Sequence, residues 1–223
     1  MKRNLVFPLI GVCALVLTSL ACQTLLGGGS NLPQAGSAPA DTILFQDDFS
    51  DSNSGWDAVR VDEGITDYEN GAYRIFVNMQ NNDVWANPGL SFTDVHIAVD
   101  ATKIGGPDDN DFGVICRYED ADNFYFFIIS SDGFYGIGKV SGGEQSLLGM
   151  DGMGQSDAIF QGAATNHIEA ECKGSQLTLW ANGTQLFSTE DSEFSSGDVG
   201  LIAGTFDTVG TDISFDNFIV TRP

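Results

Sequence analysis

Two glutamates separated by a single residue, Glu169 and Glu171, have a spacing that suits chemistry. Side chains two positions apart on a β-strand lie on one face, about 6.6 Å apart. That separation is a workable starting point for the two carboxyls of a glycoside-hydrolysing site. Hydrolysis by this pair is therefore one functional hypothesis.

The same face is expected to carry further polar and aromatic side chains. If Cys116 pairs with Cys172, strand alternation places Arg117 beside the two glutamates, and Thr178 and Trp180 continue that face on the neighbouring strand. Sugars offer apolar ring faces to aromatic side chains and hydroxyls to charged groups, so these residues predict a glycan-binding patch. The alternative is a solvated strand face on which Arg117 pairs with one glutamate.

Two of the four cysteines, Cys116 and Cys172, lie inside strand-like runs. An even pair in an exported chain predicts a disulfide, with two buried free thiols as the alternative. Alternation then puts Val114 and Tyr118 on the same face as Cys116.

The evidence for export lies in residues 1–22. Lys2 and Arg3 precede a short apolar run, and Ala21-Cys22 ends it, which is the pattern of a secretory signal. The cysteine directly after a small residue resembles a bacterial lipoprotein signal, in which that cysteine, here Cys22, carries the lipid. An uncleaved membrane helix and an ordinary cleaved signal are the alternatives.

Residues 23–41 are rich in Gly, Ser, Pro and Ala, which predicts a flexible tether ahead of a folded domain at 42–223. The chain would then be exported and held by lipid on the outside of a bacterial membrane. Its 31 acidic and 9 basic residues give a net charge of −22. Such a charge repels phosphate backbones and argues against a nucleic-acid partner.

The fold prediction starts from residues 112–130, where two aromatic-rich apolar runs flank the acidic turn 119–123. This pattern predicts a hairpin, and the second run is apolar on both faces, which places it inside a sheet. Similar short runs separated by turn residues continue along the chain, and Asn182-Gly183 is a strong hairpin signal. With no helical periodicity, the sequence predicts an all-β, two-sheet antiparallel sandwich of about a dozen strands.

A series of motifs resembles the concanavalin A-like lectin/glucanase superfamily over residues 43–223, and most resembles its laminin-G-like and family-16-like jelly rolls. The motifs occur in this order: Asp47-Asp-Phe-Ser, Gly55-Trp56, Tyr68-x-x-Gly71-x-Tyr73, Gly113-x-x-Cys-Arg-Tyr118, Asn123-Phe-Tyr125, Ser131-Asp-Gly133, Leu179-Trp-Ala-Asn-Gly183, Gly197-x-Val-Gly-Leu201 and Phe215-Asp-Asn-Phe218. The resemblance implies a jelly roll but not one function, because this fold serves sugar binding, adhesion and catalysis alike.

The resemblance also helps to choose between catalysis and binding. Related glucanases carry Glu-x-Asp-x-x-Glu on such a strand, whereas this chain has Glu171 in the middle position and Gly174 in the third. The motif is broken, so we favour a module that binds a glycan or surface polymer over an enzyme. An adhesion or structural domain without a small ligand is a further alternative.

Relatives hold a structural calcium ion where the terminal strands lie side by side. Here Asp47, Asp48 and Asp216 offer the oxygens that such an ion prefers, and residues 108–111 form a second acidic loop. We expect no other cofactor to be required. Trp56 and Trp85 are interpreted as anchors of the core or of turns, not as ligand platforms.

Overall fold

The computed structural model describes residues 42–223. The predicted signal segment, the lipidation site at Cys22 and the tether lie outside the described residues. Within residues 42–223 all regular structure is β, in sixteen strands. No helix in this range is long and apolar enough to cross a membrane.

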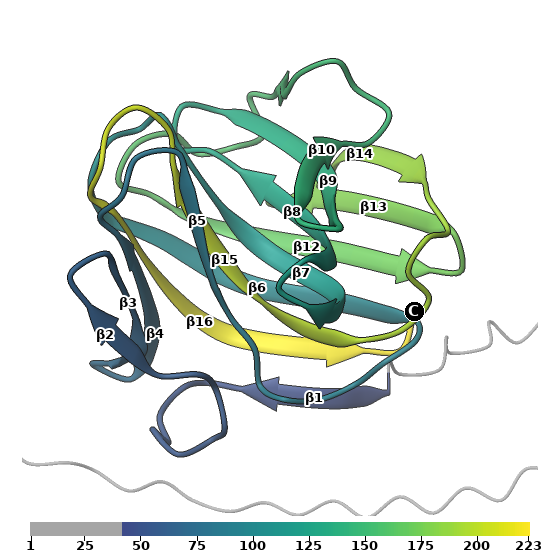
Figure 1. Cartoon of the computed structure of the whole chain (residues 1–223), viewed down its shortest axis with the longest axis horizontal. Helices are drawn as coiled ribbons and strands as arrows, with labels where there is room; N and C mark the ends of the chain where they lie inside the picture. The colour runs from purple at the N-terminus through teal and green to yellow at the C-terminus, as the bar shows by residue number, and fades with distance from the viewer. Residues whose placement is uncertain (1–41) are drawn as a thin grey trace, which may run out of the picture. The chain divides into compact units, whose positions relative to one another are not determined.

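The strands form two antiparallel sheets, one behind the other in Figure 1. The larger sheet runs in the order β14 (Thr184–Glu190), β13 (Gln176–Ala181), β12 (Thr165–Lys173), β6 (Val95–Gly105), β16 (Thr211–Thr221), β4 (Ala72–Val77), β3 (Gly64–Glu69) and β2 (Val59–Val61), with β1 (Ile43–Asp47) paired to β16. The smaller sheet runs in the order β10 (Glu144–Leu147), β9 (Phe134–Ser141), β8 (Asn123–Ile129), β7 (Asn110–Asp120), β15 (Asp198–Thr205) and β5 (Asn82–Ala86), with β11 (Gly154–Gln155) paired to β9.

This arrangement confirms the predicted two-sheet sandwich. Alternation decides what is buried: Val95, Ile97 and Val99 of β6 all point into the space between the sheets and are buried. The Asn182-Gly183 turn joins β13 to β14, and both of its residues have a positive φ (52° and 76°). A two-residue turn of this kind follows the twist of the flanking strands.

Strand β8 is buried on both faces and lies between β7 and β9, as its continuous apolar run predicted. Its inward side chains join the interior: Tyr125, Phe127 and Ile129. Its outward side chains belong to a second apolar cluster on the outer face of the smaller sheet: Phe124, Phe126 and Ile128. Part of the outer surface of the smaller sheet is therefore covered and shielded from solvent.

The predicted disulfide is present between Cys116 of β7 and Cys172 of β12. These strands belong to different sheets, so the bond crosses the interior and ties the two layers together.

The face assignment that followed from this pairing is wrong for Tyr118. Arg117 has a left-handed backbone (φ 51°), and the pairing of β7 with β8 shifts after Cys116. Such a bulge reverses the alternation that follows it. Tyr118 consequently packs against Phe124 in the outer cluster, with ring centroids 5.6 Å apart, and not beside Cys116.

Candidate functional site

Four of the five residues of the predicted glycan patch lie together on the outer face of the larger sheet. Glu169 pairs with Trp180, and Glu171 pairs with Thr178, across β12 and β13. His96 of β6 joins them, with its Nε2 3.1 Å from Glu169 Oε2 and its ring 5.7 Å from that of Trp180. Sequence reasoning did not assign His96 to this face.

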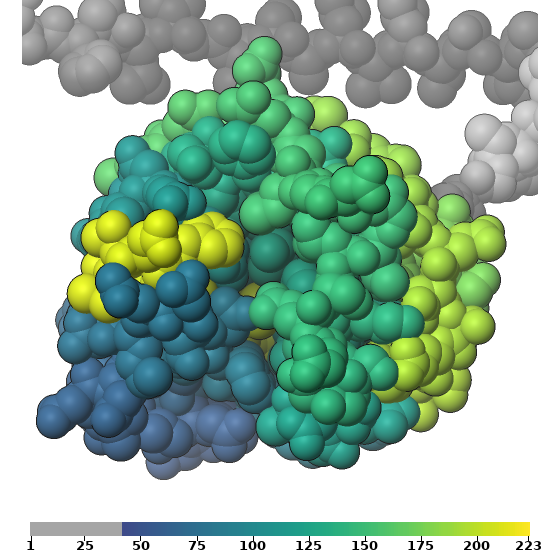
Figure 2. Space-filling view, turned by 45° about the horizontal axis from the view of Figure 1, so that its top comes forward, coloured from purple at the N-terminus to yellow at the C-terminus, as the bar shows by residue number. Residues whose placement is uncertain are grey.

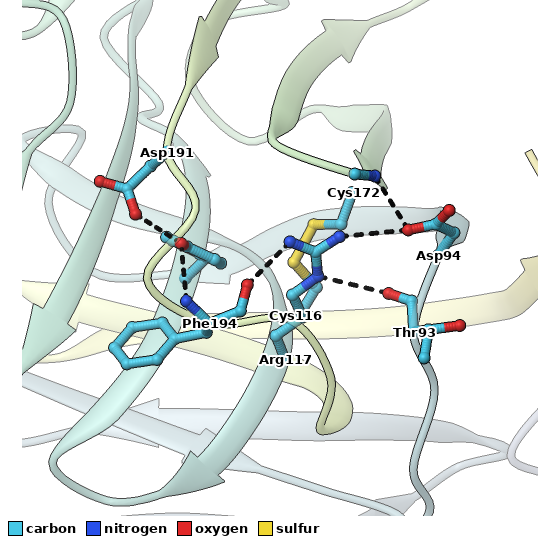
Figure 3. The surroundings of a disulfide bond; sticks show 9 residues. Thr93, Asp94, Cys116, Arg117, Cys172, Asp191 and Phe194 are labelled. Atoms are coloured by element: carbon cyan, nitrogen blue, oxygen red, sulfur yellow. Dashed lines mark hydrogen bonds and ion pairs between the residues drawn. A yellow bond between two sulfur atoms is a disulfide. The ribbon is translucent and has the colours of Figure 1, made fainter.

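Arg117, the fifth residue, is not part of that patch, which corrects the sequence-based placement. It belongs to the smaller sheet and is 2% exposed. Its guanidinium donates to the carbonyls of Thr93 (3.3 Å) and Phe194 (2.8 Å) and to Asp94 Oδ1 (3.2 Å), beside the disulfide (Figure 3). Arg117 thus joins two loops to β7 and is not available to a ligand.

Each of the three predicted calcium ligands accepts a hydrogen bond from a nearby group of the protein. Asp47 accepts from the amide of Phe49 (2.8 Å), the indole of Trp56 (2.9 Å) and the hydroxyl of Ser54. Asp48 and Asp216 each accept from a nearby backbone amide: Ser50 at 3.0 Å and Asn217 at 2.7 Å, respectively. Within residues 42–223 no three Asp, Glu, His or Cys side chains are grouped to hold a metal ion.

A different site lies on the outer face of the smaller sheet, where a groove of about 720 Å³ crosses the strands. We call it the acidic groove. Figure 2 shows this hollow, with a floor of strands β7 and β8 between the segments near residues 80 and 206 on one side and 143–153 on the other. Its lining includes Asn81, Asn82, Asp83, Trp85, Asp111, Asp122, Phe124, Phe126, Ile128, Gln145, Leu147, Met153, Thr205 and Phe206.

The floor of the acidic groove is apolar, and glycines on β9 make room for the large apolar side chains of the neighbouring strands. A Cβ at Gly138 would meet the ring of Phe126 at 2.1 Å, and one at Gly136 would meet Leu147 at 2.9 Å. The two glycines of β9 therefore allow these side chains to lie across the sheet. Trp85 of β5 lies on the other side of the groove. Its side chain is partly exposed, and its ring centroid is 5.3 Å from that of Phe124.

Two carboxyl groups face each other in this groove across a glycine. Gly204 of β15 is paired with Asp83 of β5 on one side and with Asp111 of β7 on the other. A Cβ at Gly204 would lie 2.1 Å from Asp83 Oδ1 and 2.6 Å from Asp111 Oδ2. The absence of a side chain at residue 204 is what lets the two carboxyls converge.

The environment of this pair favours protonated carboxyls. Burial raises the pKa of Asp111 well above its usual range, and the charge of nearby Asp83 raises it further. Burial likewise raises the pKa of Asp83, while a hydrogen bond from Gln145 Nε2 (3.1 Å) opposes that shift. The pair titrates as one coupled system, in which the first ionisation hinders the second.

The chemistry available in the acidic groove is recognition of a ligand with both apolar and hydrogen-bonding faces. Trp85 offers an aromatic surface, and Asp83, Asp111 and Gln145 offer polar atoms beside it. The two carboxyls are too close for inverting glycoside hydrolysis, which needs about 6.5–9.5 Å between them.

Part of this site was visible in the sequence. Asp83 and Trp85 have the same parity in Asn82–Ala86, and Asp111 lies in the acidic segment 108–111 that was considered for calcium. Trp56 is buried in the core as predicted, and Trp85, which packs beside Phe124 in the outer cluster, also lines the groove. Only the register of three strands shows that Asp83 and Asp111 meet at Gly204.

Comparison with known proteins places the fold. No protein-family model matches the sequence, and no curated protein matches it. Among solved structures, the chain is similar to the carbohydrate-binding module CBM66 from Bacillus subtilis, with a TM-score of 0.61 and 18% identity over 75% of this chain and 96% of that one.

Two further structures have the same architecture. A protein of unknown function with a galectin-like fold from Bacillus subtilis gives a TM-score of 0.61 at 9% identity, over 81% of this chain and 96% of that one. An endo-β-galactosidase from Clostridium perfringens that releases GlcNAcα1-4Gal gives 0.58 at 8% identity, over 84% of this chain and 64% of that enzyme. At these identities the likeness establishes the sandwich fold and no activity.

Proposed function

We propose that the protein is a glycan-binding module and that the ligand lies in the acidic groove. The observation that carries this proposal is the combination in one hollow of the partly exposed ring of Trp85, the carboxyls of Asp83 and Asp111 and the amide of Gln145. A sugar ring presents an apolar face and a rim of hydroxyls, and this lining matches both. Similarity to a carbohydrate-binding module and to a glycan-cleaving enzyme supports the same class of ligand.

The test compares two tryptophans on opposite outer faces of the sandwich. Retention of the purified protein on a panel of polysaccharides should fall at least tenfold in Trp85→Ala, because the stacking surface is lost. Trp180→Ala, on the outer face of the larger sheet, should bind like the unmodified protein. Loss of binding in Trp180→Ala alone would move the site to the predicted patch with Glu169 and Glu171.

Two alternatives remain as hypotheses with their own measurements. Glycoside hydrolysis by Glu169 and Glu171 predicts a glycan-cleaving activity that Glu171→Gln abolishes. An adhesion or structural role predicts no retention on any glycan and crosslinking to envelope proteins on intact cells.

The location of the module is also part of the proposal. We infer that the chain is exported, that its lipid is carried on Cys22 and that residues 23–41 tether the domain to the outside of a bacterial membrane. The support is the pattern of residues 1–41 in the sequence.

A further inference from the structure

The carboxyl pair in the acidic groove lacks a positive partner. Asp111 is 4% exposed, and its Oδ1 has no hydrogen-bond donor in the described part of the chain. Asp83 accepts a hydrogen bond from the neutral amide of Gln145. Among residues 42–223, no Lys, Arg or His lines the groove.

The surroundings of the groove add to the negative charge. Asp122 also lines it. An adjoining hollow of about 460 Å³, which shares Met153 and Phe206 with it, carries Asp109 and Asp132, and none of the described residues that line it is basic. A ligand that enters this region therefore meets several carboxyls at short range. Anionic sugars are disfavoured there by repulsion, and cationic groups are attracted.

Two converging carboxyls in a shielded place either retain a proton or, when both ionise, need a cation between them. A sugar hydroxyl supplies a donor but no charge. A protonated amine supplies both, since it carries a full positive charge and three N–H donors for the two carboxyls. A hard metal ion is a poorer match, because calcium takes six to eight oxygens and only two carboxylates converge here.

We propose that the groove recognises an amino sugar with a free amine, whose ammonium group lies between Asp83 and Asp111 while its ring packs on Trp85. This inference rests on the proposed glycan binding and names the class of sugar. Over Gly204, oxygens of Asp83 and Asp111 lie close enough together for one ammonium group to contact both carboxyls. N-acetylation of the sugar removes the charge and two of the three donors, so the acetylated sugar is expected to bind weakly.

The test uses three β-1,4-linked tetrasaccharides that differ at the 2-position: glucosamine, N-acetylglucosamine and glucose. Calorimetric titration of the purified protein near pH 6.5 and at physiological salt should give one site, with the glucosamine tetramer at least tenfold tighter than the other two. Asp83→Asn and Asp111→Asn should remove this preference. Asp157→Asn, an exposed substitution outside the groove with the same change in charge, should keep it.

A second variant tests the geometry without changing the charge. Gly204→Ala places a methyl group where the two carboxyls converge, at a backbone conformation that alanine adopts freely, and should also remove the preference for the amine. Thermal unfolding of each variant verifies that it is folded. Preference retained in Gly204→Ala and in both Asp variants would overturn the proposal.

The remaining outcomes separate this inference from the proposed function. Equal binding of all three tetrasaccharides, lost in Trp85→Ala, would leave glycan binding standing and refute the amine site. No binding of any glycan would refute both. Calcium binding to chelator-treated protein that depends on Asp83 and Asp111, with no preference for the amine, would replace the ammonium with a metal ion. Weak binding of glucosamine at many sites, unchanged in every variant, would mark attraction to the acidic surface alone and contradict the proposal.

Discussion

At the scale of single residues, Asp111 and Arg117 show opposite ways of burying a charge. Arg117 is 2% exposed, but its guanidinium donates to two carbonyls and to Asp94, so its charge and its donors have partners. Asp111 is about as buried and has an oxygen without a donor. Since an unpaired buried group is costly, Arg117 fits a structural role and Asp111 fits a role that a ligand completes.

Because burying the ionised Asp111 carboxyl costs free energy, the stability of the protein is expected to depend on pH. Its folded-state pKa is raised, so its stabilising contribution is complete below the unfolded-state pKa and is lost as pH rises through the folded-state pKa. Asp111→Asn does not titrate, and its amide can donate to Asp83. Without ligand, Asp111→Asn should therefore gain about 1–3 kcal/mol of unfolding free energy at pH 7 and little at pH 4.

Thermal or denaturant unfolding at the two pH values measures this difference. Asp157→Asn serves as the control, because that aspartate is exposed and should show no comparable pH-dependent gain. If Asp111→Asn changed the unfolding free energy equally at pH 4 and pH 7, ionisation of the buried Asp111 carboxyl would not be what destabilises the folded protein.

At the scale of elements, strand periodicity predicted the sandwich well and failed at one bulge. The double-sided run of β8 and the Asn182-Gly183 hairpin each have a local sequence signal, and the structure confirms both. The bulge at Arg117 has no such signal, because a positive φ is unusual for arginine and is fixed by contacts with distant loops. Predictions that extended alternation past residue 117 therefore went wrong.

The disulfide between β7 and β12 gives the second prediction at this scale. It joins residues 56 positions apart and links the two sheets. By the chain-entropy model, replacing both cysteines with alanine should cost about 4 kcal/mol of unfolding free energy. Denaturant unfolding of Cys116→Ala/Cys172→Ala measures this loss, and adding reductant to the unmodified protein should lower its stability in the same direction. A loss below about 1 kcal/mol would show that packing between the sheets alone holds them together.

At the scale of the whole molecule, the candidate site is assembled from segments far apart in the chain. Asp83, Asp111 and Gly204 meet only because β5, β15 and β7 are neighbours in one sheet. Composition and local pattern carry no information on that register, which long-range pairing sets. By contrast, the patch around Glu169 and Trp180 lies on a local hairpin, so alternation placed those two residues on one face correctly.

The location of the whole molecule gives a last prediction. If Cys22 carries the lipid, Cys22→Ser should block lipid attachment while leaving the domain at 42–223 unchanged, since Cys116 and Cys172 form their own bond. In cells grown with a labelled fatty acid, the unmodified chain should carry the label and sediment with membranes, and the variant should do neither. Cys116→Ala/Cys172→Ala is the matched control, because it also removes cysteines but should keep the label. Label retained in Cys22→Ser would refute the anchor, whereas membrane sedimentation without any label would point to an uncleaved apolar segment within residues 5–21 as the means of attachment.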